Sequence, residues 1–400
     1  MGILQRAAKI LLVCVNLILL SGCWDRTEVN DLALIVGLGI DQKKDGKIMI
    51  TVELIAPKAA GGGQMLGGGG GDGGGGGRGK IVRSGTGATV ADAISNLQEK
   101  LPRRVFWGHT KVIVFGERAA RAGIRQHLDF LSRNPQARLR SNVLVSKGTA
   151  KSVLELIPPI EQSSSEVLRE LSESQLLLRV TIKDALQMLS GDTGAAALPM
   201  VKILPREKGA KELQTIAFTQ RTAIFKKDKM IGDIDDKLTR GVLWLRNEIK
   251  RANITVSLKG EKGNITAAMI RAHTELVPKY EKGKWKMIVK ATTEDDIILN
   301  GTKLDLLNPK YVKMVEKELE NETNKRIRDA LKKVQKEMKA DIFEFAEIFH
   351  RKYPQEWNRV KNRWEEIFPT VEVVVKTKAY VRRPGIDTAP QGLPEQEVKK

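Results

Sequence analysis

Cys23 is the residue with the clearest chemistry in this sequence. It directly follows Leu20, Ser21 and Gly22, and it is one of only two cysteines among 400 residues. A thiol after small residues at the end of an apolar run resembles the lipobox of bacterial lipoproteins, in which the sulfur receives a diacylglycerol and the chain is cut before the cysteine. We therefore expect lipidation at Cys23, with or without a further N-acyl chain. An ordinary leader with a chance cysteine is the alternative.

Residues 1–22 have the pattern of an export signal. Arg6 and Lys9 precede an apolar run, Ile10–Leu20, that contains a single polar residue. This run is too short to cross about 30 Å of hydrocarbon as a permanent anchor. Cleavage would also remove the second cysteine, Cys14, so the mature chain could form no internal disulfide. Two acyl chains on Cys23 would hold the protein at a membrane where one chain would be marginal.

A strong excess of positive charge predicts an anionic partner. Lysine and arginine number 68 against 48 acidic residues, which gives a formal net charge of +20. Export argues against nucleic acid, so anionic lipid or an acidic protein surface is the expected partner. Seven arginines form a candidate basic patch that faces the membrane or a partner: Arg103, Arg104, Arg118, Arg121, Arg125, Arg138 and Arg140. A merely solvated basic face is the alternative.

Catalytic and metal-binding patterns are missing from the sequence. It contains no G-x-S-x-G, S-x-x-K or H-E-x-x-H motif, and its four histidines are scattered. A calcium-loop pattern that starts at Asp41 has Lys43 and Val52 at ligand positions, and Gly74–Lys80 matches a phosphate loop except that Ile81 replaces the serine or threonine. We therefore expect no enzyme activity, no metal and no cofactor beyond the lipid. A cell-wall hydrolase is the alternative that these absences disfavour.

Residues 23–204 are predicted to form two α/β subdomains. The expected elements are a hairpin of Leu34–Ile40 with Lys47–Ile55, a helix capped by Thr89, a strand Lys111–Phe115, a helix Arg118–Ser132, a strand Arg140–Val145 and a helix Thr181–Leu189. Residues 158–175 are predicted as a polar connection that enters a helix, and a glycine and alanine loop is expected up to Pro199. Residues 61–79 hold fourteen glycines in nineteen positions, which predicts a mobile loop.

Residues 205–385 are predicted to form an α+β domain, an antiparallel sheet packed by a long helix. The expected strands are Ile216–Phe225, Ala252–Lys259, Ile265–Leu276, Trp285–Thr292 and Val371–Val381, with hairpin-like turns such as 226–232 and a short helix over 238–249. Asn308 and Pro309 begin the long helix, whose apolar positions recur through Phe349, and Pro354 begins another. Residues 386–400 are expected to be a frayed tail.

Two aromatic groups have two interpretations each. Phe106, Trp107 and His109 could stack on a sugar or an amino acid, although aromatics beside a strand more often pack a core. The aromatic residues between Phe343 and Trp364 have helical spacing, which favours a core over an interface with a membrane subunit.

Three blocks of sequence resemble one family. "GCWDRTEVNDLALIVGLGIDQ", "FWGHTKVIVFGERAARAGIRQHLDFLSRNPQAR" and "DIFEFAEIFHRKYPQEWNRVKNRWEEIFPTVEVVVKTKAYVRRPG" are similar in order and spacing to the Ger(x)C spore germination lipoproteins. The resemblance implies a non-enzymatic α+β ectodomain with about three α/β subdomains. It also implies a lipid-anchored C subunit of a nutrient germinant receptor on the outer face of the spore inner membrane, assembled with A-type and B-type integral-membrane subunits. A lipoprotein that binds the nutrient itself is the alternative.

Overall fold

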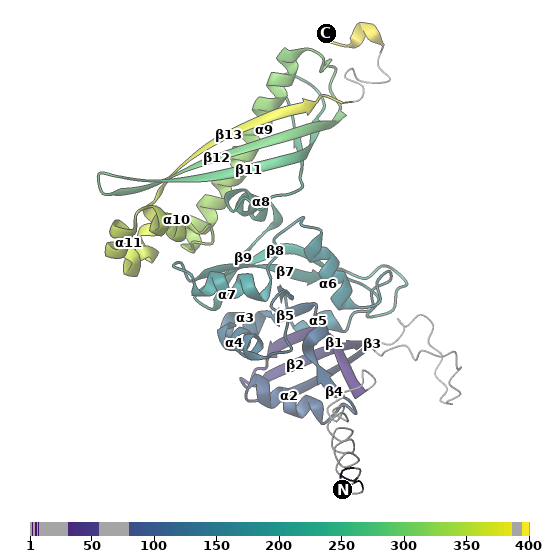
Figure 1. Cartoon of the computed structure of the whole chain (residues 1–400). Coiled ribbons are helices and arrows are strands. Elements are labelled where there is room, and N and C mark those ends of the chain that lie inside the picture. Colours follow the sequence, from purple (N-terminus) through teal and green to yellow (C-terminus); the bar gives the residue numbers. More distant parts are fainter. Residues whose placement is uncertain are drawn as a thin grey trace.

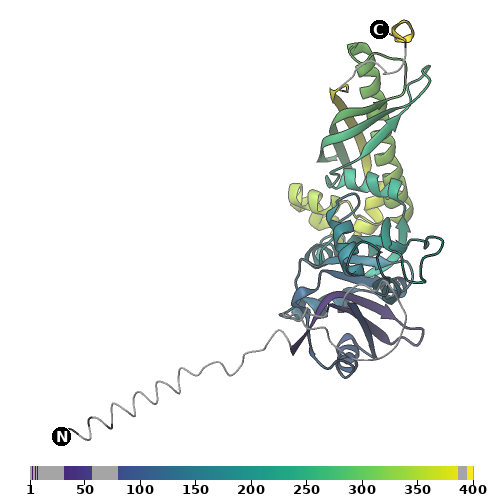
Figure 2. The same ribbon diagram turned by 90° about the vertical axis from the view of Figure 1, so that its right-hand side faces the viewer.

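The computed structural model describes residues 31–55, 80–385 and 394–399, with isolated positions 2, 5 and 7. The predicted lipidation site Cys23 and the glycine tract 61–79 lie outside the described residues. The described chain forms an N-terminal sheet region and a C-terminal sheet region that follow each other along the long axis of the molecule (Figures 1 and 2). Among the described helices, none combines the length and the apolar character needed to cross a membrane.

The N-terminal region is built on a nine-stranded mixed sheet. Its order is β3-β2-β1-β5-β6-β7-β8-β9, with β4 also paired to β1. The strands are β1 Leu32–Gln42, β2 Ile48–Ile55, β3 Lys80–Gly87, β4 Arg104–Phe106, β5 Val112–Gly116, β6 Asn142–Ser146, β7 Ala195–Ile203, β8 Ala217–Lys226 and β9 Lys229–Ile234. Strands β1, β4, β5, β6 and β7 run parallel, whereas hairpin partners at both ends of the sheet run antiparallel.

Helices cover both faces of the parallel strands. They are α2 Val90–Gln98, α3 Glu117–Ala122, α4 Arg125–Arg133, α5 Ala150–Leu154, α6 Ser164–Glu173 and α7 Ile182–Ser190, with a 3-10 turn η2 at Trp107–His109. In β5, Ile113 and Phe115 belong to one buried cluster with α3, α4 and α7, whereas Val112 and Val114 belong to another with α5 and α6. Burial on both faces explains why β5 is apolar at every position.

Three elements of this region differ from the sequence prediction. The helix expected over 118–132 is two helices, because Gly123 has φ +133° and ends α3. The prediction of a glycine and alanine loop up to Pro199 is wrong, because β7 begins at Ala195. Ala195, Ala196 and Ala197 are buried, so packing rather than β-propensity makes this segment a strand. The segment 226–232, expected as a turn, contains the start of β9.

Strand pairing continues across the predicted domain border at residue 204. Strands β7 and β8 lie on either side of it and pair from Ala195–Lys226 to Ile203–Ala217. The shortest pairing along the sheet is instead between β6 and β7, which pair only at Val145–Met200 and Ser146–Val201. The strands β7, β8 and β9 therefore form one unit that draws on both predicted regions.

The C-terminal region is a four-stranded sheet packed against a long helix, as predicted, but the sheet is mixed rather than wholly antiparallel. Its order is β10-β11-β12-β13, with β10 Asn253–Val256, β11 Ile265–Glu281, β12 Lys284–Asn300 and β13 Glu372–Arg383; α8 Asp236–Leu245 precedes it and α9 Pro309–Ala330 packs on it. Strands β10 to β12 are antiparallel, and β13 joins β12 in parallel because a long helical crossover connects them.

The long helix ends earlier than its apolar pattern suggests. Asn308 caps α9, which continues as a π-helical segment η3 Leu331–Met338 and stops at Lys339, where φ is +54°. The apolar positions beyond it belong to separate short elements: α10 Phe345–Lys352, α11 Pro354–Val360, η4 Lys361–Arg363, α12 Trp364–Ile367 and η5 Phe368–Thr370. Part of the tail predicted to be frayed is bound: the turn η6 Glu395–Glu397 is followed by Lys399, whose ammonium lies 2.7 Å from Glu261.

Candidate functional sites

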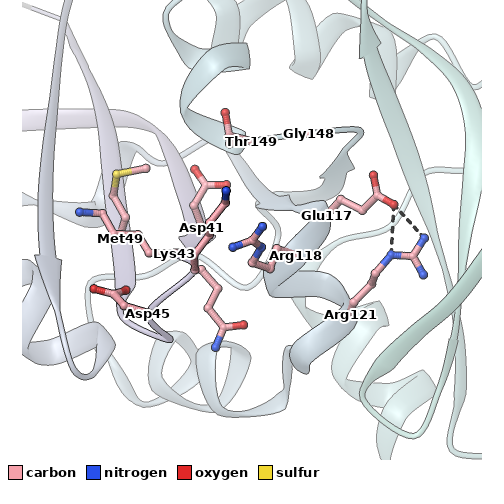
Figure 3. Close-up of a pocket in the computed structure, with 11 residues that line it drawn as sticks. Asp41, Lys43, Asp45, Met49, Glu117, Arg118, Arg121, Gly148 and Thr149 are labelled. Atoms are coloured by element: carbon pink, nitrogen blue, oxygen red, sulfur yellow. Dashed lines mark hydrogen bonds and ion pairs between the residues drawn. The ribbon is translucent and has the colours of Figure 1, made fainter.

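A cavity opens where the parallel strands β1, β5 and β6 end. This carboxyl edge is the usual place for ligands in open α/β sheets. The cavity has a volume of about 780 Å³. Its lining is shown in Figure 3 and consists of Asp41, Gln42, Lys43, Lys44, Asp45, Met49, Glu117, Arg118, Arg121, Gly148 and Thr149.

The Asp41 side chain connects β1 to α5 at this edge. One carboxylate oxygen accepts a hydrogen bond from the Ala150 amide at 2.8 Å, and the other accepts one from the Lys151 amide at 2.9 Å. Its carboxyl group is 4% exposed, and burial raises its pKa above the ordinary value despite these bonds. The first turn of α5, capped by Thr149, is therefore tied to the end of β1.

The remaining charge of the cavity is positive. Arg121 is paired with Glu117 at 2.8 Å, and Asp45 lies 3.9 Å from Lys47. Lys43, Lys44 and Arg118 form no ion pair with any residue in the described ranges, and Figure 3 shows Arg118 directed toward the end of β1. These three cationic groups have no ion-pair partner among the described residues, and their side chains also contribute apolar methylene groups. Such a lining suits a small organic anion better than a cation.

The seven predicted arginines are all exposed, but they do not form one patch. Arg104 pairs in register with Leu32 at the start of β1, and the loop before β6, which carries Arg138 and Arg140, is joined to this end by a 3.3 Å bond from the Trp107 amide to Gln136. Arg118 and Arg121 lie at the opposite, carboxyl edge, and Arg125 begins α4 beside the β8–β9 turn. We call Arg103, Arg104, Arg138 and Arg140 the arginine edge.

The aromatic groups are mostly core. Trp357 and Trp364 are 1% and 4% exposed and Phe345 and Phe349 are fully buried, which confirms the core interpretation of this segment. Trp364 also donates a 2.9 Å hydrogen bond to Asp341, whose pKa burial raises to about 6. Trp107 is buried at 5% exposure and packs the N-terminal core, so it presents no stacking face to a solute.

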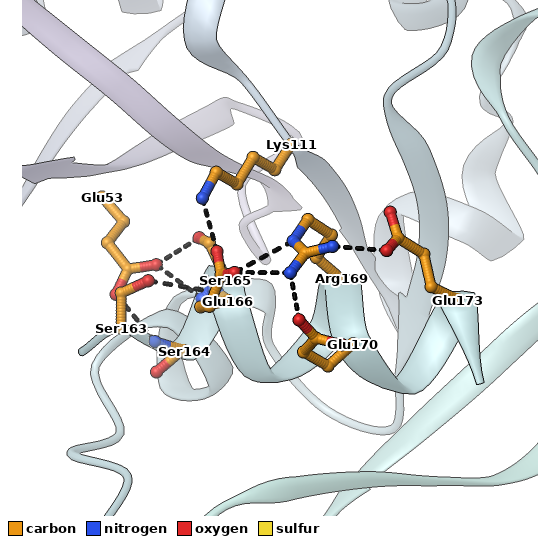
Figure 4. A network of polar contacts seen from close by, with 9 residues as sticks. All are labelled: Glu53, Lys111, Ser163, Ser164, Ser165, Glu166, Arg169, Glu170 and Glu173. Atoms are coloured by element: carbon orange, nitrogen blue, oxygen red, sulfur yellow. Dashed lines mark hydrogen bonds and ion pairs between the residues drawn. The ribbon is translucent and has the colours of Figure 1, made fainter. Parts of the chain in front are cut away.

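A buried polar network, not predicted from the sequence, fixes α6. Figure 4 shows Glu53 of β2 at the start of this helix. Its carboxylate accepts bonds from the Ser164 and Ser165 amides at 3.0 and 2.8 Å and lies 3.0 Å from the Lys80 ammonium. The available signals were a lone acid inside the apolar strand "IMITVELI" and three serines before "EVLREL".

Comparisons with known proteins agree along nearly the whole chain. Residues 25–203 match the family model "Spore germination protein N-terminal domain", and residues 220–385 match "Spore germination B3/ GerAC like, C-terminal". Spore germination protein KC of Bacillus subtilis (strain 168) is 28% identical, covering 95% of this chain and 96% of that one. The putative spore germination protein YfkR of the same organism is 30% identical, covering 94% and 95%.

The fold is also that of a solved structure. The crystal structure of the GerBC protein superposes with a TM-score of 0.55 at 21% identity, covering 89% of this chain and all of the other. Sequence models, relatives and fold thus agree on one assignment. The chain belongs to the Ger(x)C family of spore germination proteins.

Proposed function

We propose that this protein is a non-enzymatic, lipid-anchored subunit of a spore nutrient germinant receptor. It would be attached through diacylglycerol on Cys23 to the outer face of the spore inner membrane and assembled with A-type and B-type integral-membrane subunits. The germination relatives and the lipobox-like "LSGC" support this proposal. The role requires a positioned surface rather than a catalytic centre.

The register of Leu32 with Arg104 is the observation that carries the orientation. Seven residues lie between Cys23 and Asp31, the first residue of the described fold. Fully extended, the eight Cα–Cα steps from Cys23 to Asp31 span at most about 29 Å. A lipid on Cys23 would therefore hold the amino ends of β1 and β4, and with them the arginine edge, close to the bilayer.

The charge of this edge suits an anionic membrane. A basic residue near such a surface contributes roughly 1 kcal/mol, and the attraction extends over about 8–10 Å at physiological salt. Four exposed arginines would thus orient a body that the acyl chains already hold. The other three predicted arginines lie elsewhere and would contribute less.

Mass spectrometry and co-purification from spore membranes test the proposal together. We expect the mature chain to begin at Cys23 with a diacylglycerol mass, and to co-purify with two integral-membrane proteins. Cys14→Ser is the matched control, because that residue leaves with the leader and its loss should change neither result. An unmodified Cys23 thiol or an uncut leader in wild-type protein would refute the anchor.

The carboxyl-edge cavity favours a second candidate function, direct binding of a nutrient. Its unpaired Lys43, Lys44 and Arg118 could hold the carboxylate of an amino acid. Calorimetry of the protein with amino acids and sugars tests this role. A binding heat that is lost in Arg118→Ala would support nutrient binding. If none of these compounds gives a binding heat, only the assembly role remains.

A further inference from the structure

An apolar groove runs along the outer side of α6. It has a volume of about 420 Å³, and its lining includes Ile160, Val167, Leu171 and Leu176 together with Glu161 and Glu170. Ile160 is 91% exposed and Leu176 is 53% exposed. Exposed apolar side chains gathered around one depression mark interaction sites more often than chance solvent exposure. We call this feature the α6 groove.

The fold prevents α6 from turning these side chains inward. Its first turn is tied to Glu53 through the Ser164 and Ser165 amides, and Leu168 is fully buried on the inner side. At Gly37 of β1, an added Cβ would lie 1.9 Å from the Ser165 hydroxyl, so helix and strand are in direct contact. The apolar outer side is therefore a permanent feature of the surface.

The border of the α6 groove is acidic although the protein is strongly basic. Glu161 and Glu170 are the charged residues among its lining, and no lysine or arginine of the described chain is found there. Arg169, the neighbour of Glu170 in α6, is shared by three carboxylates, those of Glu166, Glu170 and Glu173 (Figure 4), so it neutralises only part of this negative charge. This charge would repel anionic lipid and attract a cationic segment.

The α6 groove also begins beside the end of the sheet that carries the arginine edge. Lys111, directly before β5, pairs with Glu166 on the first turn of α6. If the arginine edge faces the bilayer, a protein that emerges from the membrane would reach the groove without a long extension.

We infer that the α6 groove binds an apolar segment flanked by lysine or arginine, supplied by an integral-membrane partner. This inference rests on the proposed function and adds the surface at which assembly occurs. Apolar side chains of the partner would fill the space between Ile160, Leu171 and Leu176, and its cations would approach Glu161 and Glu170. Such a division between apolar anchor and polar rim is typical of protein interfaces.

Photocrosslinking in spore membranes tests the inference on the full, lipidated chain. A benzophenone amino acid replaces Ile160, and the matched control replaces Ile231, an isoleucine of β9 that is 42% exposed and outside the groove. We expect a crosslink from position 160, and not from 231, to an apolar segment with adjacent lysine or arginine in a co-purifying membrane protein. A crosslink to lipid, to a second copy of this chain or to an acidic segment would overturn the inference, as would no crosslink.

Charge reversal supplies a second readout in the same membranes. Glu161→Lys with Glu170→Lys should lower the crosslink yield from position 160 by about tenfold, because like charges then meet across the interface. Glu99→Lys with Glu366→Lys makes the same charge change at exposed sites elsewhere and should leave the yield unchanged. Unchanged yield in the first pair would contradict the acidic-rim argument.

Co-purification separates the two levels of the proposal. If wild-type protein fails to bring down membrane proteins, the proposed assembly function fails. If it brings them down but position 160 does not crosslink to them, assembly stands and only the α6 groove is wrong.

Discussion

The arginine edge and the α6 groove are neighbouring surfaces of one sheet region with opposite chemistry. Four exposed arginines form the first, whereas the second is an apolar depression bordered by Glu161 and Glu170. The net charge of +20 therefore agrees with the arginine edge but does not describe the α6 groove. In the proposed function, lipid and protein contacts would therefore occupy separate places, and the following changes test that separation.

Loss of the lipid should have the largest effect. A chain that begins at residue 24 retains both surfaces but lacks Cys23. Its remaining attraction to the membrane, roughly 4 kcal/mol from four arginines, is screened by salt. On vesicles of anionic lipid, which contain no partner subunit, we expect a 1 M salt wash to release it while the full chain requires detergent. Retention of the shortened chain after the wash would show that something other than the lipid holds it.

Reversal of the arginine edge should have the next largest effect. In the chain from residue 24, changing Arg103, Arg104, Arg138 and Arg140 to glutamate should weaken binding to vesicles rich in anionic lipid by about 4 kcal/mol, roughly a thousandfold. The same change at Arg118, Arg121 and Arg125 is the comparison, and sedimentation with vesicles is the measurement. Equal losses from both sets would mean that charge, and not its position, governs binding.

The support of the α6 groove should respond to a single substitution. Glu53→Ala leaves Lys80, whose side chain is 11% exposed, and two amides without their partner, so we expect a loss of about 3 kcal/mol in the free energy of unfolding. Urea denaturation measures it. Glu161→Ala on the rim should change stability by less than about 0.5 kcal/mol. Similar values for both would mean that the network does not hold α6.

The smallest expected effect is a change of folding stability with pH that leaves membrane binding unchanged. Asp295 of β12 is fully buried, and burial raises its pKa to about 6 from its ordinary value of 3.8. A raised carboxyl pKa favours the protonated folded state, so stability is highest below pH 3.8 and declines as pH rises through about 6. We expect Asp295 to account for a loss of about 1.5 kcal/mol between pH 5 and pH 8, which Asp295→Asn removes.

Vesicle binding by the arginine edge should be constant over the same interval, because arginine stays charged. Denaturation curves and vesicle sedimentation at pH 5 to 8 provide the comparison. If binding and stability fell together in wild type and Asp295→Asn restored both, the two regions would not be independent.

The sequence correctly predicted the helices and strands whose local signals, such as caps and apolar patterns, agree with their burial in the fold. The caps Thr89, Thr181 and Asn308 each begin the helix that they were expected to begin or precede. The alternating and apolar runs gave β1, β2, β5, β6 and β13 within about two residues. Local physics failed at Ala195–Ala197, where only the surrounding sheet makes three alanines a strand.

The sites were less predictable than the fold, because they depend on residues that are far apart in the sequence. Composition identified the arginines, but only the parallel pairing of β1 with β4 and β5 assigns them to opposite edges. The segment 158–175 was predicted to be polar, and its isolated Ile160 gave no sign of the groove that Leu176 and α6 complete. Glu53 gains its role from Ser164 and Ser165, which lie 111 and 112 positions further along the chain.

Fluorescence quenching by the bilayer tests the orientation most directly. If the proposed processing removes Cys14 and attaches lipid to Cys23, an added cysteine is the single reactive thiol. Leu139→Cys places a label beside Arg138 and Arg140, and Leu307→Cys places one directly before α9, a helix that begins at the far end of the molecule (Figure 1). These leucines are 44% and 69% exposed. A nitroxide phospholipid should quench the label at 139 strongly and leave the label at 307 unchanged. Equal quenching at both, or stronger quenching at 307, would contradict the orientation on which this account depends.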